Sequence, residues 1–378
     1  MKVSFNQTSQ VNILNKNFQP TVSKQQSQSI EPSTSELAPA GLNIAQFHNV
    51  SFGAKVKPDV QFLLSQTKWL RCAYSGTVMI HPDEAKSIYQ KLQKKPNAQS
   101  AINYLQQYQK IMHDVESAIF DIFKDTPHKG KRDFQDILRE YRPEALERLK
   151  QKQAEILHST DHIIEKLSPN IAEQVINARD IALNSIENGP FRRRTAVGMI
   201  ETISASGNDA KRLHTIHKAW YQLPSSSTDI DAFIVQYSPK PHEIIAKRLI
   251  SGAVATIEHV KPHSRGGMSE LCNYLLVAAE YNSNRQSMPL ADYINLNSRI
   301  DMRTNIQQYL DAVVEEVNDK RTAFSERSFY PLEIAETIRK ETKGFFTPTV
   351  AGLRLSKVQK RENEYPQRLG KLYKILEK

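Results

Sequence analysis

Apolar residues recur at alternating steps of four and three over much of the chain. The longest regular run extends from Ala101 to Ile122, with the spacing of one buried stripe on an α-helix. The run predicts a long helix in a bundle core, because such stripes line a cofactor groove far less often. Its members are Ala101, Leu105, Tyr108, Met112, Val115, Ile119 and Ile122.

The helical period continues after this run. Pro143 is suited to open a helix, because proline is tolerated in the first turn. Gly189-Pro190 is a stop signal. The predicted helices span 131–141, 143–167 and 170–188.

Three features complete the helical pattern. The polar loop at 223–229 offers Ser and Thr residues that could cap the next helix. A further predicted helix ends at Gly252, and residues Ile300 to Val317 are amphipathic again.

The N-terminal part of the chain departs from this period. Residues 1–58 are rich in Ser, Gln, Asn and Pro, so they cannot bury enough apolar surface to offset their ordering entropy, and we expect a disordered tail. Within residues 59–81, the runs Trp69–Tyr74 and Thr77–Ile80 predict a small hairpin that turns at Ser75-Gly76.

A second departure follows Gly252, where apolar runs flank a loop that contains proline and two glycines. Val254–Val260 and Asn273–Ala278 are predicted strands, and Lys261–Glu270 is the loop between them. A helix is expected from Glu280 to about Ser287. The pattern therefore predicts a strand–loop–strand–helix unit within a helical protein.

This unit concentrates side chains suited to phosphodiester hydrolysis. The Glu258 carboxylate and the Asn282 amide supply oxygen ligands for a hard cation such as Mg²⁺. His259 could take a proton from water near neutral pH, and Arg285 could add a cationic donor. Because neighbouring side chains on a strand point to opposite faces, a twist or bulge is needed to bring Glu258 and His259 together.

In order and spacing these residues resemble the HNH (ββα-metal) endonucleases. The matching pattern is Glu-His, then "PHSRGG" from Pro262, Asn273 before the second strand, and Asn282 in the helix. Asn273 follows His259 by 14 positions and Asn282 by 23, a spacing similar to the HNH domain of RNA-guided CRISPR effector nucleases. The resemblance covers only residues 252–297.

The resemblance implies roles for these residues. His259 would be the general base, and Glu258 and Asn282 the metal ligands, with Asn284 as a competing candidate for the amide ligand. Asn273 would tie the loop so that the imidazole is held. The expected ion is Mg²⁺, with Mn²⁺ as the alternative. His263 and Arg265 lie in the loop, where they could contact phosphate.

Cysteine usage separates this chain from many HNH proteins, which carry two Cys pairs around a structural zinc. The chain has two cysteines, Cys72 and Cys272, so four ligands could be assembled only by recruiting histidines, and no structural zinc is expected. The segment "RCAYSG" at residues 71–76 resembles a zinc-knuckle turn without its metal, and could pack near the site. Two cysteines also indicate a reducing compartment, and we expect a cytoplasmic protein.

A net charge of +10 favours an anionic partner, with DNA expected first and RNA as the alternative. No apolar run is long enough to span a membrane, and no membrane partner is expected. Candidate phosphate contacts are Arg192, Arg193 and Arg194, then Lys211-Arg212 with Lys218, and the basic segment 354–378.

The fold class expected is mainly α, with an embedded ββα-metal nuclease unit that cleaves DNA. Two alternatives remain: an HNH unit that binds nucleic acid without cutting it, and a helical scaffold whose basic surface is incidental. The predicted parts are a tail at 1–58, a hairpin-like segment at 59–81, a helical region at 82–250, the HNH unit at 251–297 and a helical C-terminal region at 298–378.

Overall fold

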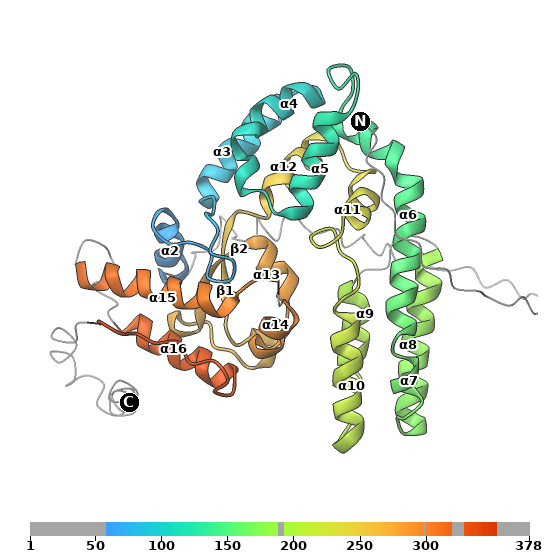
Figure 1. The fold of residues 1–378 in the computed structure, drawn as a ribbon, viewed down its shortest axis with the longest axis vertical. Helices are drawn as coiled ribbons and strands as arrows, with labels where there is room; N and C mark the ends of the chain where they lie inside the picture. The colour runs from blue at the N-terminus through green and yellow to red at the C-terminus, as the bar shows by residue number, and fades with distance from the viewer. Residues whose placement is uncertain (1–57, 188–192, 298, 320–328, 354–378) are drawn as a thin grey trace, which may run out of the picture. The chain divides into compact units, whose positions relative to one another are not determined.

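The computed structural model describes residues 58–187, 193–297, 299–319 and 329–353. Over these residues the protein is mainly helical, as the apolar period predicted, and two short strands form a sheet (Figure 1). The expected tail lies outside the described residues except for Pro58.

The first part of the described chain consists of helices and short 3₁₀ segments. In order these are α2 (Pro58–Ser65), η1 (Gln66–Lys68), α3 (Pro82–Leu92), α4 (Ala98–Leu105), η2 (Gln106–Ile111), α5 (Asp114–Asp125), α6 (Phe134–His158), α7 (Asp161–Ile164) and α8 (Pro169–Glu187).

The second part contains the sheet. Its elements are α9 (Arg193–Glu201), α10 (Gly207–Trp220), α11 (Ile230–Tyr237), α12 (His242–Ser251), β1 (Ala255–His259), η3 (His263–Arg265), η4 (Leu271–Asn273), β2 (Tyr274–Ala278), α13 (Ala279–Arg285), α14 (Leu290–Leu296), α15 (Met302–Asp319) and α16 (Tyr330–Glu341). The expected helix that ends at Gly252 is confirmed as α12, and the amphipathic stretch from Ile300 as α15.

Buried apolar side chains form two clusters. The first joins α3, α4, α5, the first half of α6, α11 and α12, with the rings of Phe123 and Phe134 stacked 4.0 Å apart. The second contains the sheet together with α2, α8, α9, α10 and α14 to α16. Burial of each large side chain contributes ~1.5–3 kcal/mol. Since α12 belongs to the first cluster and continues directly into β1, the two clusters meet at the start of the sheet.

The long helix predicted from Ala101 to Ile122 is interrupted. Residues 106–111 form the 3₁₀ segment η2, and Met112 has extended backbone before α5 begins at Asp114. The apolar stripe nevertheless packs on the first cluster. A 3₁₀ turn also returns to the same face after three residues, so the spacing identifies the buried face but not the helix type.

Pro143 does not open a helix, because α6 runs through it from Phe134 to His158. A proline removes one backbone donor from the ladder. The side chains of Leu138 on one side and Ala145 on the other both pack in the first cluster, and this packing stabilises the two halves as one helix.

The hairpin predicted within 59–81 is not formed. Pro58–Ser65 is helix α2, whose Leu63 is fully buried against the second cluster. The following segment makes a turn closed by a hydrogen bond from Cys72 N to Thr77 O (2.9 Å), and Ile80 forms a single parallel bridge with Val254. Apart from this turn, the segment pairs with residues that are distant in sequence and does not form a two-stranded hairpin.

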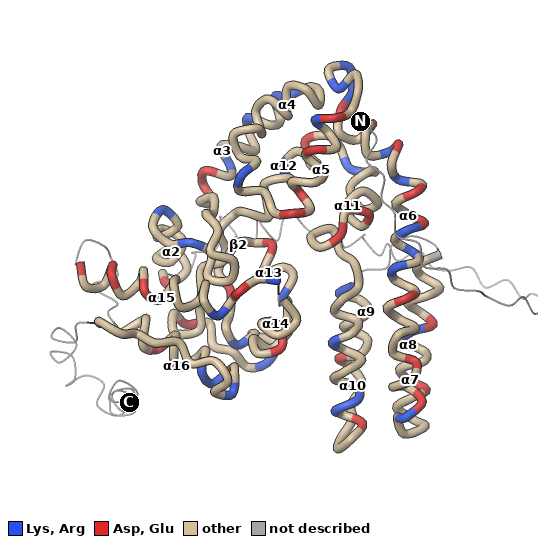
Figure 2. The backbone as a smooth tube through the Cα atoms, in the orientation of Figure 1, with Lys and Arg blue, Asp and Glu red and all other residues tan. Residues whose placement is uncertain are grey.

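The loop at 223–229 ends in the residue that caps α11. The Asp229 side chain accepts from Ala232 N (3.0 Å), so the cap is Asp in place of the expected Ser or Thr. Figure 2 shows Lys and Arg interspersed with Asp and Glu along the long helices. Over the described residues no helix combines the length and the apolar character needed to cross a membrane.

Candidate active site

The predicted strand–loop–strand–helix unit is confirmed. β1 pairs antiparallel with β2 in a regular register that places Glu258 opposite Leu275 and His259 opposite Tyr274. α13 follows β2 without a break and packs on both strands. The connection between the strands, expected as a simple loop, contains the two 3₁₀ turns η3 and η4.

Asn273 ties this loop together. Its Oδ1 accepts from Lys261 N (2.8 Å), and its Nδ2 donates to Lys261 O (3.0 Å) and Met268 O (2.8 Å). The side chain is buried at 3% exposure, and its backbone O accepts from Val260 N (2.9 Å). The amide therefore holds the loop closed directly beside the end of β1, which is the position that the sequence led us to expect.

The Gly266-Gly267 pair allows this closure. Gly266 has φ +79°, a left-handed conformation that other residues rarely adopt. A Cβ on Gly267 would lie 1.9 Å from Lys261 O. Only glycine permits the backbone to approach so closely, so these two residues are required by the loop geometry.

Asn282 and Asn284 face different partners. Asn282 Nδ2 donates to Ile257 O (3.0 Å), which holds the amide against β1. Asn284 turns to α9, where its Oδ1 and backbone O each accept from Arg193 Nη2 at 3.2 Å. Of the two amides, Asn282 is therefore the one that lies against the strand of Glu258 and His259.

Glu258 and Arg285 form a buried ion pair. Arg285 Nη1 contacts Glu258 Oε1, and the exposed fractions are 0% for Arg285 and 3% for Glu258. The guanidinium also donates to His259 O (2.7 Å) and Val260 O (2.6 Å), and to Tyr74 OH (3.2 Å). Arg285 therefore clamps the end of β1, and the prediction that it offers a cationic donor to phosphate does not fit its burial.

Burial also controls the protonation of Glu258. It raises the pKa of the carboxyl to about 7, although the charge and the hydrogen bond of Arg285 oppose the shift. Burial likewise raises the pKa of the Tyr74 phenol, which stays neutral. Glu258 can thus change its charge near neutral pH.

His259 lies on the other side of β1. Its ring contacts Tyr274 edge-on at a centroid distance of 4.9 Å and faces the His263 ring at 6.3 Å. The register is regular through His259, with no bulge in the pairing of β1. Since side chains alternate along such a strand, Glu258 points towards α13 while His259 points towards Tyr274, and the pairing of β1 with β2 contains no bulge that would bring them together.

Some of the expected phosphate contacts are exposed to solvent and others are buried. His263 and Arg265 are exposed on η3, and Arg194 is exposed on α9. Arg193 is buried at 8% exposure on Asn284, and burial lowers its pKa. Arg193 is therefore a packing residue and not the free cation that the sequence predicts. Arg192 lies outside the described residues.

The segment "RCAYSG" packs on the sheet despite its distance in sequence. Ala73 N donates to Leu276 O (3.0 Å), and the buried Cys72 Sγ accepts from Ala278 N (3.3 Å). Cys272 is partly exposed near Glu270. In the described part of the chain no three His, Cys, Asp or Glu side chains gather as a metal-binding group.

The beginning of α13 carries a second buried cluster. Arg248 is paired with Glu116, and the nearly buried Glu280 lies beside them against Gly252 and His113. Burial raises the pKa of Glu280 well above its usual range, the charge of Glu116 adds to this, and Arg248 opposes it. Two carboxyl groups here share one guanidinium.

The oxygen donors suit a hard divalent cation in kind. Arg285 occupies Oε1 of Glu258, which leaves Oε2 for a second ligand, and Asn282 commits Nδ2 to the strand, which leaves Oδ1. Mg²⁺ commonly takes one or two protein oxygens and keeps several waters. Glu258 and Asn282 thus match the kind of donor that Mg²⁺ takes, an oxygen of a carboxylate and an oxygen of an amide.

Comparisons of the chain with protein-family models, with curated proteins and with solved structures give no match.

Proposed function

We propose that the protein is a metal-dependent endonuclease of the HNH type that hydrolyses phosphodiester bonds of DNA. The observation that carries the proposal is Asn282, held by its Nδ2 against Ile257 O on the strand that ends in Glu258-His259. The loop braced by Asn273 supports it, because that loop fixes the same strand end.

In this proposal His259 accepts the proton of the attacking water. The edge contact with Tyr274 and the braced loop hold its ring, so little ordering entropy is lost during reaction. Glu258 Oε2 and Asn282 Oδ1 would hold a Mg²⁺-type cation. When bound, such a cation disperses the negative charge that develops on phosphate oxygens.

Arg285 acts in this proposal as a positioning residue. It holds the backbone of His259 and Val260 through its donors and keeps Glu258 in place. A rival function also has an observation in its favour. The regular register separates Glu258 from His259, and Arg285 covers one Glu258 oxygen, which suits an HNH unit that binds nucleic acid without cutting it.

Metal-titrated plasmid cleavage tests the proposal. Purified protein is incubated with supercoiled plasmid in EDTA, Mg²⁺ or Mn²⁺, together with the variants Asn282→Ala and Asn284→Ala. Asn282→Ala removes a proposed ligand, so the metal concentration for half-maximal cleavage should rise at least ~10-fold, on the scale of losing a group that supports a metal. Asn284→Ala is the matched control and should cleave as the wild type does.

Cleavage that persists in EDTA would exclude a metal-dependent reaction. DNA binding without cleavage under any metal would favour the non-cutting rival. A larger loss in Asn284→Ala than in Asn282→Ala would assign the amide ligand to the other residue.

A further inference from the structure

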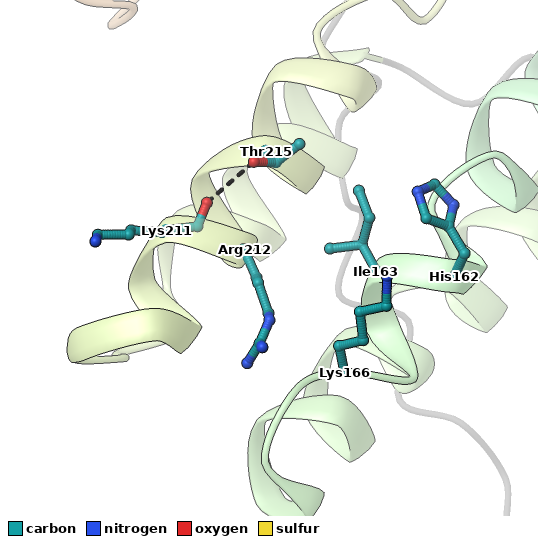
Figure 3. A pocket seen from close by; sticks show the side chains of 6 residues that line it. All are labelled: His162, Ile163, Lys166, Lys211, Arg212 and Thr215. Atoms are coloured by element: carbon teal, nitrogen blue, oxygen red, sulfur yellow. Dashed lines mark hydrogen bonds between the residues drawn. The ribbon is translucent and has the colours of Figure 1, made fainter.

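A shallow, open hollow of about 270 Å³ lies between α10 and the segment formed by α7 and the residues that follow it, outside the ββα unit. Figure 3 shows Arg212 of α10 facing Ile163 and Lys166 across it, while Lys211 extends outward from α10. Residues from two helices that are far apart in sequence thus converge on one surface. The lining consists of His162, Ile163, Lys166, Lys211, Arg212 and Thr215.

The hollow carries more positive than negative charge. Lys166 and Lys211 are exposed. Arg212 pairs with Asp209 through Nη1 at 3.2 Å, which leaves the other N–H groups of its guanidinium as donors. Asp161, the acid next to His162, is engaged by Arg179 (Nη1–Oδ1 2.5 Å). An anion with several oxygens suits such a lining, because guanidinium and ammonium groups both donate to phosphate.

The next basic residue of the predicted cluster on α10 is Lys218. Lys218 contacts Asp292 of α14 (Nζ–Oδ1 2.6 Å), so this cation, expected in the basic cluster, is neutralised.

The face of α10 beyond Arg212 is long enough to lie along a few nucleotides. Six residues separate Arg212 from the level of Lys218, or about 9 Å at ~1.5 Å per residue. One strand of DNA advances ~3.4 Å per phosphate, so this stretch of helix would follow about three nucleotides. A backbone held at the hollow could therefore continue along this face of α10.

We propose that the hollow and the adjoining face of α10 bind the phosphate backbone of nucleic acid, as a contact separate from the ββα unit. Lys166 and Arg212 hold phosphate oxygens across the hollow. The identity of the ligand rests on the proposed nuclease function, but the binding itself is measured without cleavage.

The test measures binding of a labelled duplex of about 25 base pairs in EDTA across a series of salt concentrations. Lys166→Gln/Arg212→Gln removes two cations and should reduce the log–log salt slope by up to about 1.8, at ~0.9 per phosphate contact. The matched control is Lys91→Gln/Lys94→Gln, two exposed lysines at the end of α3, and its slope should stay at the wild-type value. Thermal unfolding of both variants checks that they fold.

A second variant tests the same hollow by gain of binding. Asp209→Asn removes the acid that pairs with Arg212 and keeps an oxygen for Ser168 N. Affinity for the duplex should rise about twofold, the scale of one exposed pair.

A wild-type slope in Lys166→Gln/Arg212→Gln, or tighter binding of phosphatidylserine vesicles than of duplex, would overturn the proposal. These outcomes differ from failure of the proposed function, which is DNA binding without metal-dependent cleavage.

Discussion

The two ends of α13 are both fixed by buried charges, but the charges balance differently. At its end, Arg285 meets one carboxylate, Glu258, and donates its other hydrogen bonds to the carbonyls of His259, Val260 and Met288 and to Tyr74. At its beginning, Glu280 and Glu116 share Arg248.

Burial raises the pKa of the carboxyl group at both ends, of Glu258 and of Glu280, but the two ends differ in their hydrogen bonds and in their balance of charge. A guanidinium with several directed hydrogen bonds fixes the position of the atoms around it, so the end of α13 determines where the candidate site lies. Two carboxyl groups beside one guanidinium leave one negative charge in excess, and burial makes it costly. The beginning of α13 therefore holds a proton and responds to pH.

The largest expected change in stability comes from breaking the ion pair between Arg285 and Glu258 at the end of α13. Arg285→Met removes the guanidinium and leaves Glu258 buried without its cation, which should lower the free energy of unfolding by ~3–5 kcal/mol. Urea unfolding at pH 8 measures the loss. Arg139→Met, at an exposed position of α6, is the control and should change stability by less than ~0.5 kcal/mol. An equally small loss in Arg285→Met would show that the pair contributes little.

A smaller change in stability, of opposite sign, is expected at Glu280, at the beginning of α13. The pKa of Glu280 is raised in the folded state, so its proton stabilises the fold at low pH, and this stabilisation is lost as pH rises through the folded pKa. Glu280→Gln imitates the protonated carboxyl at every pH. The free energy of unfolding of the variant should equal that of the wild type at pH 5 and exceed it at pH 9. The difference at pH 9 should be ~1.4 kcal/mol for each tenfold gain in the proton affinity of the Glu280 carboxyl on folding.

Thermal unfolding from pH 5 to pH 9 checks this expectation. Glu173→Gln, on an exposed face of α8, provides a control for the loss of one charge. If the difference between Glu280→Gln and wild type did not grow with pH, the beginning of α13 would not carry the excess carboxylate.

The local features of the site could be predicted from sequence. The two apolar runs and the loop with Gly266 and Gly267 between them predicted the two strands and their connection, and α13 begins within one residue of its expected start. The role of Asn273 in closing the loop was implied by the resemblance to the HNH endonucleases. These elements depend on neighbours in the chain, and local patterns report such contacts directly.

Contacts between distant residues could not be predicted in this way. A charged side chain is usually exposed, so the sequence predicts Arg285 as a surface cation, and nothing in its neighbourhood indicates that Tyr74 lies against it (Nη1–OH 3.2 Å). Lys218 was expected as a free cation for the same reason, since its partner Asp292 lies on α14. Burial of a charge depends on residues that meet only in the folded chain.

The measurement that tests the central claim most directly compares wild type with His259→Ala in cleavage and in binding. Plasmid cleavage in Mg²⁺ and duplex affinity in EDTA are measured on the same preparations. Loss of a positioned base should reduce cleavage at least ~10²-fold, while affinity stays within about twofold, because the substitution removes no phosphate-binding cation of the α10 surface. Equal metal-dependent cleavage by the two proteins would contradict the assignment of His259 as the base.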